Sequence, residues 1–214
     1  MDTLHIMGEQ PMLPIEIVAI LDRSGSMASI RDDSIGAFNT FIEEQQKESG
    51  EANVTIVLFD DKYEILQDRA SLKDAIKFDR ENFVPRGWTA LHDAIGRTIN
   101  KFKALRDEGK VDGVIISILT DGDENYSTEF DLAAIKSMIG IAEKEYGWSF
   151  VYLGANQDAF SVGASMGLAA AACATYDASS DGIKLASKKM SGDTIMYRSM
   201  YYDKKAAKAA SATE

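Results

Sequence analysis

Short apolar runs alternate along the chain with longer segments in which apolar residues recur every three to four positions. The runs are typical of buried strands, and the longer spacing is typical of helices that cover a sheet. We predict strands at residues 15–21, 53–59, 63–67, 111–119, 148–153 and 172–176. We predict helices at residues 27–47, 71–76, 89–106, 130–145 and 158–166, and a last one that begins after a cap at Ser179 or Ser180.

This order of elements predicts an α/β fold with a doubly wound, mostly parallel sheet flanked by helices on both faces. The strand at 63–67 follows the turn at Asp60 and Asp61, so we expect it to pair antiparallel with the strand before it. The run 168–176 is ambiguous, because its alanines favour a helix while the order of elements favours a final strand. Gly192 is a candidate break in the last helix.

The sequence predicts one main domain with two short appendages. Residues 1–14 form a leader with two prolines and no clear period, which we expect to pack loosely or to add an edge strand. Residues 15–203 form the domain, and residues 204–214 form a Lys/Ala-rich tail that we expect to fray. With 214 residues and 45% hydrophobic residues, the chain can bury a full core, which excludes a disordered composition.

Charge and cysteine content exclude several classes of partner. The formal net charge of −11 argues against recognition of nucleic acid through a broad basic surface. The single cysteine, Cys173, cannot form an internal disulfide and is expected to be a small buried residue, which suits a reducing cytoplasm. We find no basic-then-apolar secretory leader and no uncharged apolar run of about 18 residues, so we expect a cytoplasmic protein without a membrane partner.

The most informative segment for chemistry is the end of the first predicted strand. The apolar run 17–21 stops abruptly at Asp22, which is followed by Ser24 and Ser26 on alternate positions. One carboxylate and two hydroxyls can turn toward one point and suit a hard cation such as Mg²⁺. Open α/β sheets bind their ligands at the carboxyl ends of the strands, so the sequence predicts a metal site at this position.

This segment resembles the metal-ion-dependent adhesion site (MIDAS) of von Willebrand factor type A (VWA) domains. That site combines Asp-x-Ser-x-Ser with a distant Thr and with an Asp that follows a later strand. The chain has Thr89 within Gly-Trp-Thr-Ala-Leu, and it has Asp121 within Thr-Asp-Gly after the apolar run 115–119. The resemblance covers roughly residues 15–176, and the family's five ligand positions are matched by Asp22, Ser24, Ser26, Thr89 and Asp121.

The resemblance implies a metal-dependent protein-binding module and no enzyme. Ser24 and Ser26 would bind the metal directly, whereas Asp22, Thr89 and Asp121 would bind it directly or through water. Mg²⁺ is the expected ion, with Mn²⁺ or Ca²⁺ as alternatives, and an Asp or Glu of a protein partner would complete its coordination. The chain looks like the short bacterial and phage-type members of the family.

Three other interpretations fit parts of the pattern. Ser24, Ser26 and Thr89 taken singly are also typical helix caps and turn formers. A Mg²⁺-dependent phosphohydrolase of the haloacid dehalogenase type also places an Asp after its first strand, but it needs a second Asp where this chain has Ser24. The third alternative is a structural or assembly protein in which the metal stabilises a self-contact. We find no further acid–base set that would support an enzyme.

Several residues near the predicted site have two interpretations each. Asp123 and Glu124 are either solvated loop charges or groups that select against acidic partners. Trp88 and Tyr126 are either contact residues on a binding face or packing residues. His92 lacks a companion at metal-ligand spacing and is expected to be a partly exposed structural residue.

Overall fold

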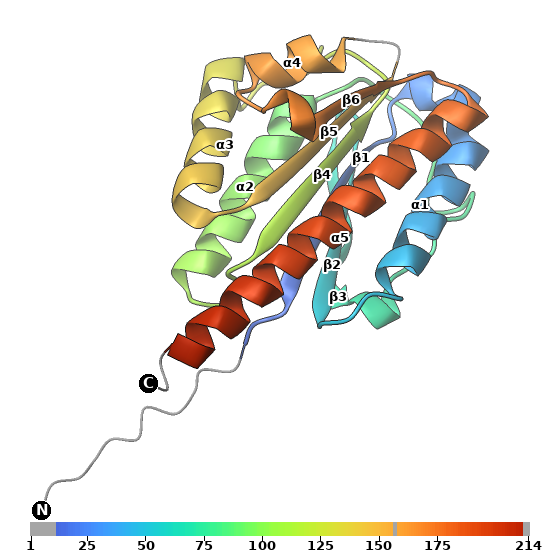
Figure 1. The fold of residues 1–214 in the computed structure, drawn as a ribbon. Coiled ribbons are helices and arrows are strands. Elements are labelled where there is room, and N and C mark those ends of the chain that lie inside the picture. Colours follow the sequence, from blue (N-terminus) through green and yellow to red (C-terminus); the bar gives the residue numbers. More distant parts are fainter. Residues whose placement is uncertain (1–11, 156–157, 212–214) are drawn as a thin grey trace, which may run out of the picture.

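The computed structural model describes residues 12–155 and 158–211, which form a six-stranded sheet between two layers of helices (Figure 1). The strands are β1 (Ile15–Asp22), β2 (Ala52–Phe59), β3 (Tyr63–Ser71), β4 (Val114–Thr120), β5 (Ser149–Ala155) and β6 (Cys173–Tyr176). The α-helices are α1 (Arg31–Gln45), α2 (Leu91–Asp107), α3 (Leu132–Tyr146), α4 (Ala159–Ser165) and α5 (Ser180–Ser211). The strand order is β3-β2-β1-β4-β5-β6, and only the β2–β3 pair is antiparallel among these strands. The predicted doubly wound fold is confirmed, including the antiparallel pair and the final strand.

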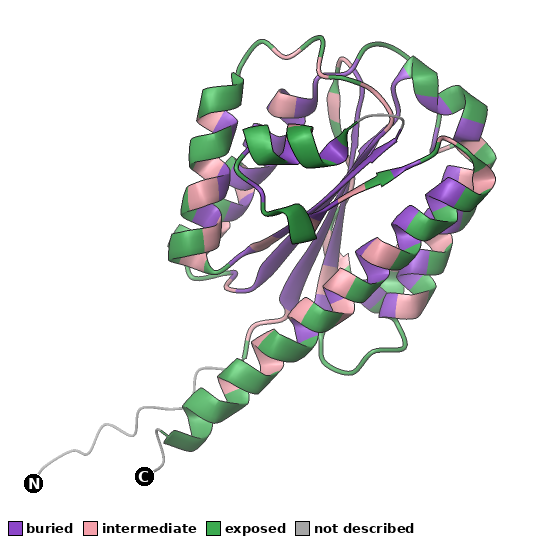
Figure 2. Cartoon of the chain, turned by 45° about the horizontal axis from the view of Figure 1, so that its top comes forward, coloured by how far each residue is buried: buried purple, intermediate pink, exposed green. Residues whose placement is uncertain are grey.

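Helices cover both faces of the sheet, so the central strands are buried on both sides. In β1, Ile17, Ala19 and Leu21 pack in the core beneath α1 and α5. Val18 and Ile20 point to the opposite core, beneath α2 and α3. Figure 2 shows the central strands buried along most of their length, whereas the edge strand β3 has no fully buried residue. This two-sided burial explains why β1 is a continuous apolar run rather than an alternating one.

The connections reverse direction between β1 and β4. From β1 the chain passes through α1 to β2 on one side of β1, and it later crosses through α2 to β4 on the other side. Doubly wound sheets bind their ligands at such a reversal, outside the carboxyl ends of the two strands. The crevice therefore lies where Asp22 ends β1 and where Asp121 follows β4.

Two predicted helices differ from the observed elements. The helix expected at 27–47 begins as a 3₁₀ segment, η1 (Gly25–Ile30), and only its later part is the α-helix α1. The helix expected at 71–76 is wrong. This segment holds only a three-residue 3₁₀ turn, η2 (Leu72–Asp74), and the side chain of Ser71 makes no capping hydrogen bond. The chain becomes extended again at Ala75, and so short a segment cannot repay the cost of starting a helix.

Helix α5 is longer and more regular than the sequence indicates. It continues through Gly192 without a break, and its last turns remain helical although they are exposed (Figure 2). Alanine has the highest helix propensity, which favours a helix in the Lys/Ala-rich segment that we expected to fray. The hydroxyl of Ser179 accepts the backbone N–H of Gly182 at 3.2 Å, which confirms Ser179 as the predicted cap.

The predicted leader falls mostly on residues 1–11, which lie outside the described part of the chain. Residues 12–14 are described and form no strand. The division into residues 1–14, 15–203 and 204–214 stays a prediction. Within the described residues, no helix has the length and apolar composition that a membrane crossing requires.

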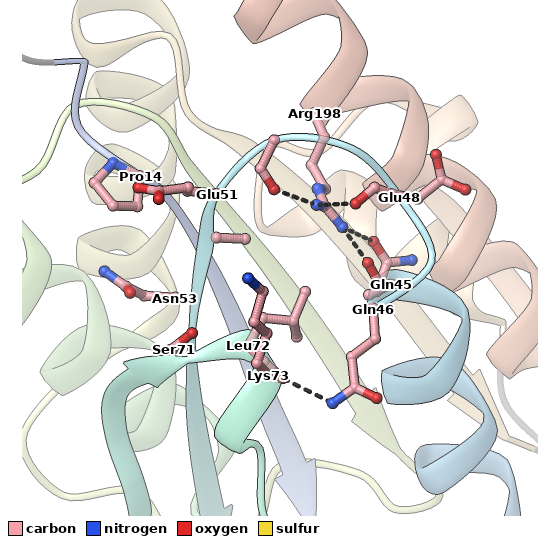
Figure 3. A pocket seen from close by; sticks show the side chains of 12 residues that line it. Pro14, Gln45, Gln46, Glu48, Glu51, Asn53, Ser71, Leu72, Lys73 and Arg198 are labelled. Atoms are coloured by element: carbon pink, nitrogen blue, oxygen red, sulfur yellow. Dashed lines mark hydrogen bonds between the residues drawn. The ribbon is translucent and has the colours of Figure 1, made fainter.

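A buried arginine ties α5 to the end of α1 (Figure 3). Arg198 is only 2% exposed, and its guanidinium donates to the carbonyl oxygens of Gln45 at 2.7 Å, Gly50 at 3.1 Å and Ser49 at 3.3 Å. Gln45 is the last residue of α1, whose carbonyl has no intrahelical partner, and Ser49 and Gly50 lie in the loop that follows, so the cation caps α1 and fastens this loop. A cavity of about 550 Å³ opens beside these contacts, near the amino end of β2 and away from the carboxyl ends of the strands.

Candidate metal centre

Three loops that are far apart in the sequence meet at the carboxyl ends of β1 and β4. Asp22 is the last residue of β1, and Ser24 and Ser26 lie in the turn that leads into η1. Thr89 lies just before α2, and Asp121 directly follows β4. All five residues that the sequence analysis selected therefore lie near this one crevice.

The carboxylate of Asp22 is buried and held at both oxygens. Its Oδ1 accepts the backbone N–H of Ser24 at 2.6 Å, and its Oδ2 accepts the hydroxyl of Thr120 at 2.6 Å. The first bond closes the turn after β1, and the second crosses to the end of β4. These bonds fix the orientation of the carboxylate before any ligand binds.

A chain of hydroxyl groups joins the first loop to the third. The Oγ atoms of Ser24 and Ser26 lie 3.0 Å apart, and the hydroxyl of Ser26 donates to Oδ1 of Asp121 at 2.6 Å. Ser24 is buried, whereas Ser26 is exposed and Asp121 is partly exposed. These hydrogen-bonded oxygens therefore extend from the buried side of the site, near Asp22, outward to solvent.

Thr89 completes the group from the second loop. A Cβ atom placed on Gly122 would lie 3.2 Å from Oγ1 of Thr89 and 3.7 Å from Oγ of Ser26, so both hydroxyls border the same glycine. The backbone of Thr89 pairs with Asn125, since its N–H donates to Oδ1 of Asn125 and its carbonyl accepts the Asn125 N–H, both at 3.0 Å. A residue with a side chain at position 122 would crowd the hydroxyl of Thr89.

The two carboxylates are unfavourable neighbours without a cation. Burial raises the pKa of Asp22 to about 6, against hydrogen bonds from Thr120 and Ser24 that lower it, and the charge of Asp121 raises it further. Burial also raises the pKa of Asp121, against the hydrogen bond from Ser26. Among the described residues, no Lys, Arg or His forms an ion pair with either carboxylate.

The donor set fits a hard divalent cation. It offers two carboxylates and three hydroxyls, all oxygen ligands of the kind that Mg²⁺, Mn²⁺ and Ca²⁺ prefer. Within the described part of the chain, there is no cluster of three or more His, Cys, Asp or Glu residues suited to a metal. The donor set described here is not such a cluster, because only two of its five members are carboxylates and the other three are neutral hydroxyls.

Two carboxylates outside this set hold the loop that follows β4. Glu124 accepts the backbone N–H of His92 at 2.8 Å, the backbone N–H of Ser127 at 2.7 Å and the Ser127 hydroxyl at 2.7 Å. Asp93 accepts the backbone N–H groups of the next three residues of this loop, 128–130, at distances of 2.9–3.0 Å. Glu124 is therefore a structural carboxylate that fastens this loop to the start of α2, and not the solvated loop charge that the sequence allowed. Its selection against acidic partners stays a prediction.

Some contributors to the centre were not found from the sequence. Thr120 orients Asp22. The one sign of this role in the sequence is that a polar residue ends a mostly apolar strand. Asn125 fixes the position of Thr89, but nothing in its sequence neighbourhood distinguishes it from a turn residue. Both act through contacts between loops, which a local pattern does not encode.

The structure resolves the interpretations of the other residues near the site. Trp88 is 62% exposed and Tyr126 is 48% exposed, so neither is a core residue. His92 is partly exposed, as expected, and its backbone N–H donates a hydrogen bond to the carboxylate of Glu124. Cys173 is buried, as predicted.

No family model and no curated protein matches this sequence. Solved structures share its fold. Proximal thread matrix protein 1 from the mussel byssus, in a structure with a zinc-occupied MIDAS motif, is 15% identical with a TM-score of 0.60 over 83% of this chain and 47% of that chain. A von Willebrand factor type A protein from Catenulispora acidiphila is 16% identical with a TM-score of 0.55 over 83% of this chain and 43% of that chain.

The manganese-loaded TRAP protein of Plasmodium vivax is 16% identical with a TM-score of 0.50 over 66% of this chain and 57% of that chain. This chain thus spans less than two thirds of the length of each of these proteins. At such identities the likeness establishes the fold alone. The chain has the fold of von Willebrand factor type A domains, as the sequence motifs implied.

Proposed function

We propose that this chain is a metal-dependent protein-binding module. Asp22, Ser24, Ser26, Thr89 and Asp121 would hold one divalent cation, with Mg²⁺ as the expected ion and Mn²⁺ or Ca²⁺ as alternatives. A carboxylate from an Asp or Glu of a protein partner would complete the coordination. The observation that carries this proposal is the 2.6 Å hydrogen bond from Ser26 to Asp121, because it joins the oxygen donors of the first and third loops.

The charge of the donor set explains why the partner would be acidic. Two carboxylates balance a divalent ion, and the three hydroxyls add no charge, so the bound ion retains attraction for one more anionic ligand. Ser26 and Asp121 reach the surface, while Asp22, Ser24 and Thr89 are buried. The residues therefore hold the ion from below and leave its outer side to a partner.

Exposed aromatic side chains flank the candidate centre. Trp88 precedes Thr89 and Tyr126 follows Asn125, and Thr89 and Asn125 are paired by two hydrogen bonds. Large exposed aromatic side chains beside a polar site are typical of the residues that dominate protein interfaces. We assign Trp88 and Tyr126 to the surface that contacts the partner.

The choice of ion, the type of family member and the location are further parts of this proposal. The zinc-occupied and manganese-loaded neighbours support a divalent cation without selecting one. The resemblance to short bacterial and phage-type members rests on the sequence, and the proposed cytoplasmic location rests on the single cysteine. Neither is needed for the metal site.

We further propose that the chain is not a phosphohydrolase. The position where such an enzyme needs a second carboxylate holds Ser24, whose hydroxyl pairs with Ser26, and both oxygens of Asp22 already accept hydrogen bonds. A screen of generic phosphate monoesters and diesters with Mg²⁺ tests this. Metal-dependent turnover that disappears in Asp22→Asn would favour the hydrolase instead.

Titration calorimetry with Mg²⁺ and Mn²⁺ tests the metal site itself. Asp22→Ala should abolish measurable binding, and Thr89→Ala should weaken it by a smaller step because it removes a neutral ligand. Asp123→Ala is the matched control, since Asp123 is an exposed carboxylate on the same loop as Asp121. Equal binding by the wild type and Asp22→Ala would remove the site assignment.

A further inference from the structure

Asp60 is the buried centre of a group of ionic side chains close to the candidate metal loops. It directly follows β2 and is fully buried. Its Oδ2 accepts Nε–H of Arg23 at 2.9 Å and Nε–H of Arg86 at 2.8 Å, and Arg23 also donates to Glu64 at 2.8 Å. We call these four residues, which carry two positive and two negative charges, the Asp60 cluster.

The backbones of the same residues join two of the metal loops. Arg23 lies inside the Asp-x-Ser-x-Ser segment, and its carbonyl accepts the backbone N–H of Arg86 at 2.8 Å. The carbonyl of Asp60 accepts the backbone N–H of Ala90 at 2.9 Å, and Ala90 directly follows Thr89. Asp60 thus contacts both loops, by its side chain and by its main chain.

Stability alone does not explain such a cluster. Arg23 is 4% exposed and Asp60 is fully buried, so both charges lose most of their hydration on folding. Buried ion pairs of this kind often contribute no more stability than apolar residues of similar volume. What the ionic cluster provides, and apolar packing would not, is directional hydrogen bonding between the two loops.

We propose that Asp60 is a positioning residue for the metal centre. It holds the loop with Asp22, Ser24 and Ser26 in register with the loop that carries Thr89, and so it sets the affinity for the cation without contacting it. This inference rests on the proposed metal site. Residues that orient ligands from outside the coordination sphere typically change metal affinity about 10–100-fold when they are replaced.

The test compares two charge-removing substitutions in the full chain, with Mn²⁺ alone as the probe. Asp60→Asn removes the negative charge and keeps the shape of the side chain. Glu16→Gln is the matched control, because Glu16 is also fully buried and bonds an arginine, with its Oε1 accepting from Arg69 at 2.7 Å and 3.1 Å. Glu16 lies near the amino end of β1, opposite the metal loops.

Both variants are expected to lose stability, which urea unfolding measures. Only Asp60→Asn is expected to lose Mn²⁺ affinity, by roughly tenfold or more in calorimetry under conditions where both variants are folded. Glu16→Gln should stay within about twofold of the wild type, since it is distant from the site. A role in stability alone would lower the urea midpoint of both variants and leave Mn²⁺ affinity unchanged in both.

A second substitution decides the case in which Asp60→Asn does not fold. Arg86 is half-exposed, so Arg86→Gln should fold while losing one of the two arginine donors to Asp60. We expect several-fold weaker Mn²⁺ binding from this variant.

The inference is overturned if the folded variants bind Mn²⁺ as the wild type does, or if Glu16→Gln loses as much affinity as Asp60→Asn. Failure of the wild type to bind Mn²⁺ is a separate result, which removes the proposed function and this inference with it.

Discussion

The hydroxyl of Ser26 donates a hydrogen bond to Oδ1 of Asp121 across 2.6 Å, although 95 positions separate the two residues. The bond joins the turn after β1 to the residue after β4, the two neighbouring strands at which the sheet connections reverse. Doubly wound sheets bind ligands at such a place because two loops leave the sheet there in opposite directions. In this chain both loops bring oxygen donors.

Replacement of Ser26 should weaken metal binding and leave the fold intact. Ser26→Ala removes one oxygen donor and the hydrogen bond to Asp121, so we expect Mg²⁺ affinity to fall roughly tenfold or more in calorimetry. Ser29→Ala is the control, because Ser29 is an exposed serine of the same turn whose hydroxyl donates to the backbone carbonyl of Ser26, at 3.3 Å. Unchanged affinity in Ser26→Ala would show that this hydroxyl is not part of the site.

Metal affinity should depend on pH through Asp22. Burial raises the pKa of its carboxyl to about 6, and a protonated carboxyl is a poor metal ligand. We therefore expect Mn²⁺ affinity to be constant above this pKa and to fall by roughly tenfold per pH unit below it, as for one displaced proton. Calorimetry at several pH values between 5 and 7.5 measures the profile, and a flat profile across that range would contradict it.

The metal-free fold should respond to the same group in the opposite direction. The pKa of Asp22 is higher in the folded state than the ordinary value of 3.8, so its contribution to stability is complete below 3.8 and is lost as the pH rises through about 6. Mn²⁺ should restore stability above that pH because it binds only the folded state. Urea unfolding with and without Mn²⁺ at pH 5 and pH 7.5 measures the difference.

Asp93 should stabilise the loop after β4 at neutral pH. Burial raises the pKa of Asp93, but the backbone N–H groups of Thr128, Phe130 and Glu129 outweigh burial and hold it below its usual value. A lowered pKa stabilises the fold above the unfolded-state pKa of about 4, and this stabilisation is lost as the pH falls through the lower folded-state value. Asp93→Asn should therefore cost about 1–3 kcal/mol at pH 7 and progressively less in acid.

Urea unfolding of this variant and of the wild type between pH 7 and pH 3 is the measurement. The exposed Asp107, which pairs with Lys103, supplies the control Asp107→Asn, which should cost much less at pH 7. A loss in Asp93→Asn that is the same at every pH would show that the charge of Asp93 is not what stabilises the loop.

The sequence predicts the sheet and the site ligands better than it predicts the supports of the site. β1 and β4 are apolar runs that stop abruptly, so their ends and the polar residues that follow them are visible in the pattern. The ligand positions Thr89 and Asp121 follow from the resemblance to a known motif. The supporting roles of Asp60 and Glu124 do not follow from such reasoning, because they include partners far away in the sequence: Asp60 bonds Arg86, 26 positions away, and Glu124 bonds His92, 32 positions away.

Helix boundaries were also harder to predict than strands. Helix α1 starts at Arg31, since residues 25–30 take up a 3₁₀ turn that keeps Ser24 and Ser26 near Asp121. Periodicity does not distinguish a 3₁₀ turn from the first turn of an α-helix. In α5 the prediction underestimated the helix. We expected residues 204–214 to fray, but the helix continues to Ser211, because the alanines near its end have high helix propensity.

Trp88 should contribute to partner binding and not to metal binding. Trp88→Ala is expected to leave Mn²⁺ affinity within about twofold and to weaken capture of the partner by roughly tenfold or more, as for an exposed aromatic at an interface. Met196→Ala is the control, since Met196 is similarly exposed, at 59%, on α5. Equal partner capture by Trp88→Ala and the wild type would place the contact surface elsewhere.

Partner capture with and without chelation tests the central claim most directly. The immobilised wild type and Asp22→Ala are exposed to the same lysate in Mg²⁺ or in EDTA, captured proteins are identified by mass spectrometry, and circular dichroism of each sample reports the fold. We predict a partner that is retained only by the wild type in Mg²⁺, with the fold unchanged by EDTA, because the hydrophobic cores on the two faces of the sheet are large, unlike those of small domains that need a metal to fold. Capture of that partner undiminished by EDTA, or unfolding of the domain by EDTA, would contradict a recognition role for the metal.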